Sequence, residues 1–194
     1  MLHCVLNLIW RTQRMQHEIL KTTTVFTGRA FDVEVLRVRL PDARERNYDL
    51  VKHPDSVTIV PVDHNGDIWF VTQYRMGSRS ILLELPAGVL DSNESPQTCA
   101  AREIREEIGM AAGKLKHLGS IYLVPGYSTE INHVFLATEL VSSPLKMDED
   151  EFLGVKKIPL AEMRALVNNG GLQDSKSIAA LYLARPLLEG TTDL

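Results

Sequence analysis

Three glutamates, Glu103, Glu106 and Glu107, occur within five residues of the segment GVLDSNESPQTCAAREIREEIGM, which spans residues 88–110. On a helix, residues three and four apart share a face, so the three carboxylates project to one side. Like charges at i and i+4, such as Glu103 and Glu107, destabilise a helix by a few tenths of a kcal/mol unless a cation neutralises them. Clustered carboxylate oxygens suit Mg²⁺ or Mn²⁺. The alternative is a solvated charged face with an Arg102–Glu106 ion pair.

The sequence predicts a helix over residues 95–108 that positions these glutamates. Ser95 can cap its N-terminus, Pro96 suits the first helical position, and Gly109 ends it. An apolar stripe for core packing is formed by Ala100, Ile104 and Ile108. The helix therefore has one side to bury and one side available for chemistry.

The spacing of the whole segment resembles the Nudix box of the Nudix hydrolases. The matching positions are Gly88, Glu94, Arg102, Glu103, Ile104, Glu106, Glu107, Gly109 and Met110. The resemblance implies an α+β fold, a Nudix-type α/β/α sandwich with a mixed β-sheet, here with an N-terminal β extension. It also implies an enzyme that hydrolyses a diphosphate linked to a second moiety with the help of Mg²⁺ or Mn²⁺.

The resemblance assigns a role to most residues of the box. Glu103 and Glu107 are expected as the main metal ligands, with Glu106 as a further ligand and the carbonyl oxygen of Ala87 completing the set. Arg102 is expected to pair with Glu94 and orient the loop, as structural support. Gly88 would allow a tight turn against the helix.

Outside the box, the chain resembles the ADP-ribose pyrophosphatase branch in the segments VTQYR, LLELPAG, YLVPGYSTE and DSKSIAALYLA. Arg75 and Val89 are then expected to contact the substrate, and Pro125–Tyr127 to shape a loop beside it. In this branch an acidic loop residue positions the attacking water or binds metal. Glu149 and Glu151 in the segment MDEDEF are the candidates, with Glu151 favoured because it precedes Phe152.

The implied reaction converts ADP-ribose, or a related nucleoside diphosphate sugar, to AMP and ribose 5-phosphate. A broad nucleoside diphosphate sugar or dinucleotide pyrophosphatase is the alternative, followed by a non-catalytic ADP-ribose sensor. The branch also implies a homodimer whose N-terminal strands help to build the partner's adenosine pocket. Trp10, Phe26 and Phe31 are candidates for base stacking, although core or dimer contacts are the better explanation of them.

The composition excludes several other classes of protein. The chain has 194 residues, is 44% hydrophobic and 24% charged, and has a net charge of −4. We therefore expect a globular protein and no nucleic-acid partner, because a basic stripe is missing. The two cysteines form no metal motif and favour a reducing, cytoplasmic location. No apolar run is long enough to span a membrane.

The remaining pattern predicts the elements that surround the box. We expect an N-terminal tail or docking segment (1–20), a β extension (21–55) that contributes to the dimer, and the Nudix domain (56–194). Residues 24–40 predict a strand pair with a bend near Val35–Leu36, and residues 41–49 a charged turn. A hairpin of 56–63 and 67–75 is predicted around Asn65–Gly66. Further strands are predicted at 80–88, 115–123, 131–140 and near 152–158. Helices are predicted at 159–171 and 174–185, the latter with Ile178, Leu181, Tyr182 and Arg185 on one side.

Overall fold

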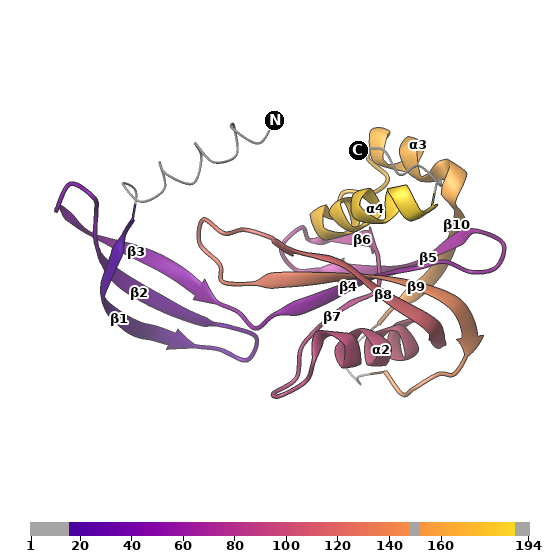
Figure 1. Ribbon diagram of the computed structural model, residues 1–194, viewed down its shortest axis with the longest axis horizontal. Coiled ribbons are helices and arrows are strands. Elements are labelled where there is room, and N and C mark those ends of the chain that lie inside the picture. Colours follow the sequence, from indigo (N-terminus) through magenta and orange to yellow (C-terminus); the bar gives the residue numbers. More distant parts are fainter. Residues whose placement is uncertain (1–15, 148–151, 189–194) are drawn as a thin grey trace, which may run out of the picture. The chain divides into compact units, whose positions relative to one another are not determined.

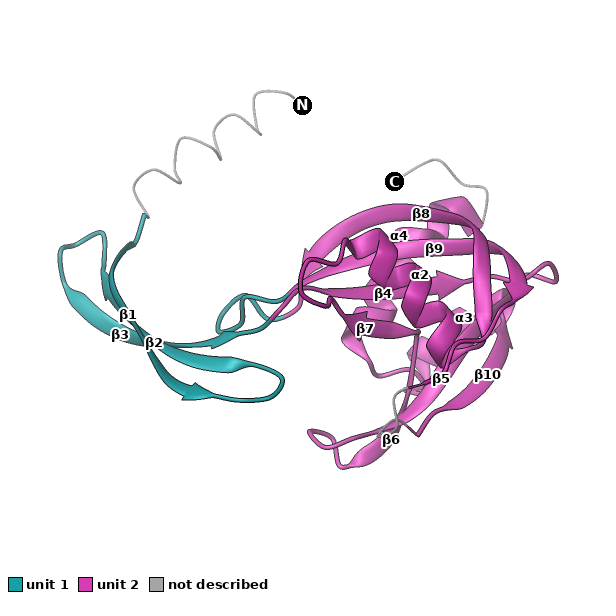
Figure 2. Cartoon of the chain, turned by 90° about the horizontal axis from the view of Figure 1, so that it is seen from below, with its two compact units in different colours: residues 1–53, 124–130 teal, residues 54–123, 131–194 magenta. Residues whose placement is uncertain are grey.

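The computed structural model describes residues 16–147 and 152–188. The chain divides into two compact units, which Figure 2 shows in different colours. Unit 1 comprises Met1–His53 and Val124–Glu130, and unit 2 comprises Pro54–Leu123 and Ile131–Leu194.

Unit 1 is built on an antiparallel three-stranded sheet. Its strands, in the order β1-β2-β3, are β1 (Glu18–Thr27), β2 (Asp32–Arg39) and β3 (Glu45–Lys52). The 124–130 loop is tied to β3: the Val51 N–H donates to the Tyr127 carbonyl at 2.7 Å, and the Thr129 N–H donates to the Val51 carbonyl at 3.0 Å.

Two predictions for this region are wrong. The expected bend near Val35–Leu36 is absent from β2, which pairs with β3 in unbroken register. The register shifts lie in β1 instead, between Ile19 and Lys21 and between Thr24 and Phe26. The charged stretch 41–49 is not all turn, because β3 begins at Glu45. Its charges pair across the sheet, as in the Arg37–Glu45 salt bridge at 2.6 Å, and such pairs stabilise a strand as readily as a turn.

Unit 2 contains two sheets. The four-stranded sheet has the order β7-β4-β9-β8, with β7 (Ala87–Val89), β4 (Ser56–Pro61), β9 (Ile131–Ser142) and β8 (Met110–Tyr122). The three-stranded sheet has the order β10-β5-β6, with β10 (Gly154–Pro159), β5 (Asp67–Arg75) and β6 (Ser80–Glu84). Strands β4 and β9 are parallel and all other pairs are antiparallel.

The predicted hairpin around Asn65–Gly66 is wrong in its pairing. The turn exists, with Gly66 at φ +83°. However, Val62, which follows β4, forms only an isolated bridge with Ile68 of β5, and the two strands belong to different sheets. Every residue of β4 is buried, and its backbone groups pair with β7 and β9 on either side. A turn signal cannot reveal that a strand is central and already has two neighbours.

Helices lie on both sides of unit 2 (Figure 1). They are α2 (Pro96–Glu107), a 3₁₀ turn η2 (Leu160–Glu162), α3 (Met163–Asn168) and α4 (Ser175–Leu188). The predicted helix at 159–171 is thus a 3₁₀ turn followed by a short helix, and the final helix continues through Pro186. In the described ranges, no helix is long and apolar enough to cross a membrane.

Two hydrophobic clusters hold the helices on the sheets. The predicted stripe of Ala100, Ile104 and Ile108 is buried, and it belongs to a cluster with Val57 and Phe135. The other cluster holds α3 and α4 through side chains such as Met163, Ala180 and Ala184. The unit is therefore an α+β sandwich with the acidic helix on one face and the C-terminal helices on the other, as expected.

Candidate active site

Helix α2 begins and ends where the sequence predicts. The Ser95 hydroxyl accepts a hydrogen bond from the Thr98 N–H at 3.2 Å, and Gly109 follows the helix with φ +69°. Glycine reaches this left-handed conformation without a steric penalty. Because the helix is uninterrupted, Glu103 and Glu107 lie one turn apart on the same face.

The carboxylates of Glu103 and Glu107 both lie against the turn that precedes the helix. The Ala87 N–H donates to Glu107 Oε2 at 3.0 Å. A Cβ atom added at Gly88 would lie 1.8 Å from Glu103 Oε1, so only glycine leaves room for this carboxylate. Glu103 is 7% exposed and Glu107 is 5% exposed. Two acidic side chains that are almost fully buried thus lie against neighbouring residues of one turn, Glu107 at Ala87 and Glu103 at Gly88.

Arg102 is the cationic centre of the box. Its guanidinium donates to Glu94 through Nε at 3.0 Å and through Nη2 at 2.9 Å. Its Nη1 also donates to Glu103 Oε1 at 2.7 Å and to Glu106 Oε2 at 2.9 Å. The structure therefore contains the Arg102–Glu94 pair that the resemblance implies and also the i,i+4 pair with Glu106 that the solvated-face alternative required.

These contacts stabilise the charged forms of both Glu94 and Arg102. Hydrogen bonds from Arg102 lower the pKa of Glu94 to about 2. The hydrogen bond with Glu94 is also the main reason that the pKa of Arg102 is raised, with Glu103 and Glu106 adding to it. The turn from residue 88 to the helix is thus fastened by an ion pair that persists over the whole neutral range.

A second charged cluster lies on β5, β6 and α4. Arg75 donates to both carboxylate oxygens of Glu84, at 2.7 Å and 2.6 Å. Lys176 also forms a short contact with Glu84 and donates to Asp174 at 2.9 Å. The Ser177 hydroxyl accepts from the Leu85 N–H at 2.7 Å. Helix α4 is thereby joined to the chain immediately before the Ala87–Gly88 turn.

The charged groups of this cluster shift one another's pKa values. The hydrogen bonds with Glu84 raise the pKa of Arg75, and the charge of Glu107 contributes as well. Burial opposes the ionisation of Glu84, but the hydrogen bonds and charges of Arg75 and Lys176 outweigh it, so the pKa of Glu84 is lowered. Arg75 remains partly exposed, with 42% of its side chain accessible.

The partners of Arg75 were not among the residues predicted for the site. Glu84 is the one acidic residue of the apolar segment LLELPAG, and a lone acid in a strand that is otherwise apolar was the available signal. Lys176 and Asp174 carry no such signal, because 92 residues separate Lys176 from Glu84.

The donor set fits a hard divalent cation, although the ligands are not gathered around one point. Glu103 and Glu107 place carboxylate oxygens beside Gly88 and Ala87 respectively, and carboxylate oxygens are the donors that Mg²⁺ and Mn²⁺ prefer. Within residues 16–147 and 152–188, no three His, Cys, Asp or Glu side chains cluster closely enough to hold a metal ion. The positive charge between Glu103 and Glu106 comes from Arg102.

The remaining candidate residues have varied surroundings. The Val89 carbonyl accepts from Arg102 Nη2 at 3.3 Å, while its side chain is 44% exposed. Phe26, Phe31 and Tyr127 are exposed residues of unit 1. Three further candidates lie outside the described residues, namely Glu149, Glu151 and Trp10.

Comparison with known proteins gives one matching family. The sequence model of the NUDIX domain matches residues 52–181. An ADP-ribose pyrophosphatase of Bacillus subtilis (strain 168) is 34% identical over 169 residues, which cover 86% of this chain and 91% of that protein. A GDP-mannose pyrophosphatase of Yersinia enterocolitica is 35% identical over 130 residues, covering 62% of this chain and 68% of that protein.

The fold also matches a solved structure. The crystal structure of an ADP compounds hydrolase superposes with a TM-score of 0.82 at 28% sequence identity. The match covers 92% of this chain and 97% of that chain, so the shared fold extends over nearly all of both chains.

Proposed function

Since this chain belongs to the Nudix hydrolases, a family whose members generally depend on divalent metal, we propose that it hydrolyses the diphosphate bond of ADP-ribose to give AMP and ribose 5-phosphate. The observation that carries the proposal is the burial of the Glu103 and Glu107 carboxylates against the Ala87–Gly88 turn. Because the chain has a net charge of −4, a diphosphate needs a local counter-charge at the site, which a divalent cation or placed arginines can supply.

Glu103 and Glu107 would hold Mg²⁺, or Mn²⁺, with Glu106 and the Ala87 carbonyl as further ligands. When bound, the metal neutralises charge on the diphosphate oxygens and lowers the pKa of water. The chain's own residues do the remaining work. The Arg102–Glu94 pair fixes the turn that carries Ala87 and Gly88, and Arg75 would bind the substrate's phosphate oxygens from β5. We assign the base that accepts a proton from the attacking water to Glu149 or Glu151, with Glu151 favoured.

A broad nucleoside diphosphate sugar pyrophosphatase is the second candidate, because a relative of similar identity is a GDP-mannose pyrophosphatase. We further propose that the enzyme is a cytoplasmic homodimer. The buried Cys99 thiol, free within the described chain, suits a reducing compartment. The exposed apolar side chains of β1 suit a partner surface.

A substrate panel tests the proposal. Purified protein is incubated with Mg²⁺ and ADP-ribose, ADP-glucose, GDP-mannose, FAD, NADH or a CDP-alcohol, and phosphomonoester release is measured with a coupled phosphatase. We expect ADP-ribose to be hydrolysed much faster than the other substrates. EDTA should abolish this activity, and added Mg²⁺ should restore it. Equal rates across the panel would favour the broad enzyme, whereas no turnover of any member would refute the hydrolase assignment for these substrates.

A further inference from the structure

A large pocket lies on the face of unit 2 that α3 and α4 cover. Its volume is about 910 Å³, and η2, α3, α4 and the turn between β4 and β5 form its walls. Small-molecule sites in proteins range from about 300 to 1,000 Å³. None of the residues of the acidic box lines this pocket, so its occupant would not share the diphosphate site.

The walls of the pocket are mainly aliphatic. They include the side chains Leu160, Met163, Val167, Ile178, Leu181 and Leu188. Met163 belongs to the buried core, and the other five pack against it, so the floor of the pocket is continuous with a rigid part of the protein. An apolar body of a ligand would therefore be removed from water on a preformed surface.

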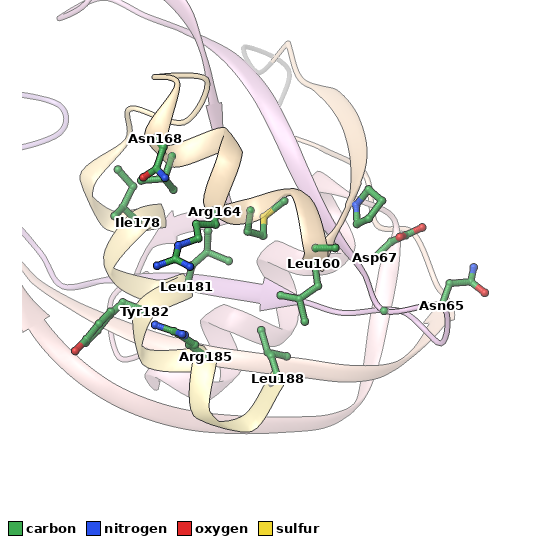
Figure 3. A pocket seen from close by; sticks show the side chains of 15 residues that line it. Asn65, Asp67, Leu160, Arg164, Asn168, Ile178, Leu181, Tyr182, Arg185 and Leu188 are labelled. Atoms are coloured by element: carbon green, nitrogen blue, oxygen red, sulfur yellow. The ribbon is translucent and has the colours of Figure 1, made fainter. Parts of the chain in front are cut away.

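The charged side chains at the pocket are two arginines and one aspartate. Arg164 on α3 and Arg185 on α4 are both exposed lining residues. In the view of Figure 3 their guanidinium groups lie at the α3–α4 side together with Tyr182, whereas Asp67, the single acidic lining residue, lies at the other end beyond Leu160. Two arginines beside an apolar cavity favour a ligand that carries an anionic group next to a hydrophobic body.

One side of helix α4 forms a wall of the pocket, as the spacing of its residues predicts. The four residues predicted to share one side of this helix, Ile178, Leu181, Tyr182 and Arg185, all line the pocket. Ala180 and Ala184 are fully buried on the other side. Ile178 and Leu181 pack against the core, which explains why they are apolar. Tyr182 is 61% exposed and Arg185 is also exposed, so core packing does not explain these two side chains.

We propose that this pocket is a binding site for an amphipathic carboxylate, an aliphatic chain with one anionic head, which binds separately from the diphosphate substrate. The chain lies on the aliphatic wall and the carboxylate is paired with Arg164 and Arg185. The negative charge of Asp67 at the far end fixes the orientation of the ligand, because it repels the anionic head.

Calorimetric titration with decanoate, below the concentration at which it forms micelles, tests the site. We expect one decanoate per chain, weaker binding of octanoate, and no measurable binding of decanol at the same concentrations. The double variant Arg164→Gln/Arg185→Gln should raise the Kd for decanoate by about tenfold or more. The matched control Lys116→Gln/Lys156→Gln removes the same charge from exposed strand positions of unit 2 and should leave the Kd unchanged.

Two further variants separate this site from folding defects and from the active site. Ala161→Phe places a ring at an exposed lining position and should block decanoate while the melting temperature stays near that of the wild type. Glu107→Gln should bind decanoate as the wild type does. Any one of three results would overturn the proposal. These are equal Kd values for both double variants, equal binding of decanol and decanoate, and loss of decanoate binding in Glu107→Gln.

Discussion

At the scale of single residues, the acidic helix is explained by what lies against it. Glu103 and Glu107 are buried, and a buried carboxylate is costly unless hydrogen bonds or opposite charge compensate for it. The Ala87 N–H compensates Glu107, and Arg102 compensates Glu103. A charge run that only faced solvent would require neither contact.

Glu107→Gln tests the role of that carboxylate. The amide oxygen can still accept from the Ala87 N–H, so the fold should persist, but the negative charge that would hold metal is lost. We expect kcat for ADP-ribose to fall on the order of 10²–10³-fold at saturating Mg²⁺. Glu139→Gln, which removes an exposed carboxylate paired with Lys114, is the control. A wild-type kcat for Glu107→Gln would show that the metal assignment is wrong.

Gly88→Ala tests the space beside Glu103. The added Cβ would lie 1.8 Å from Glu103 Oε1, so this carboxylate must move away from the turn. Because displacement of a catalytic group by about 1 Å can cost about 10²-fold in rate, we expect a loss of that order in kcat/KM. Gly77→Ala adds the same methyl group where nothing lies within 4 Å and should change little. Similar kinetics for the two variants would contradict this account of Gly88.

The Arg102–Glu94 pair should make stability depend on acid pH. The pKa of Glu94 is about 2 in the folded chain and 4.5 in the reference state, so its contribution is complete above pH 4.5 and is lost as the pH falls toward 2. Urea unfolding of wild type and Glu94→Gln should therefore show a stability difference of about 1–2 kcal/mol at pH 7 that shrinks at pH 3. A difference that is independent of pH would mean that Glu94 acts through shape rather than charge.

At the scale of elements, local signals could be predicted and long-range pairing could not. The cap at Ser95, the stop at Gly109 and the apolar stripe of α2 are encoded within a few residues, and the structure has all three. By contrast, the split of β4 and β5 into two sheets depends on β9, which follows more than 50 residues later. The site shows the same limit, since Arg102 and Glu94 share one motif whereas Glu84 and Lys176 are brought together only by the fold.

The link from α4 to the strand before the box gives an element-scale prediction. Ser177→Ala leaves the N–H of Leu85, which is fully buried, without its acceptor. We expect a loss of about 1–3 kcal/mol in the free energy of unfolding, measured in urea, together with a lower kcat because Leu85 leads directly into Pro86 and Ala87. Ser175→Ala, at an exposed position of the same helix, serves as the control. If the two serine variants are equally stable, the contact does not hold the strand.

At the scale of the whole molecule, unit 1 leaves most of its described apolar side chains at least partly exposed. Val38 is the only buried hydrophobic residue in the described part of this unit. Strand β1 is an edge strand, and it exposes Ile19, Val25 and Phe26 by 55–60%. Exposed edges with apolar side chains favour association with another chain.

We therefore expect light scattering to give twice the chain mass of 21.8 kDa, even at low protein concentration. Val25→Asp places a charge on the exposed face of β1, where it would be desolvated in a dimer, and should shift the mass to that of one chain. Val155→Asp makes the same change at an exposed valine of β10 in unit 2 and should leave the dimer intact. A wild-type species that stays at 21.8 kDa at every concentration would exclude the dimer, and every residue needed for turnover would then have to come from a single chain.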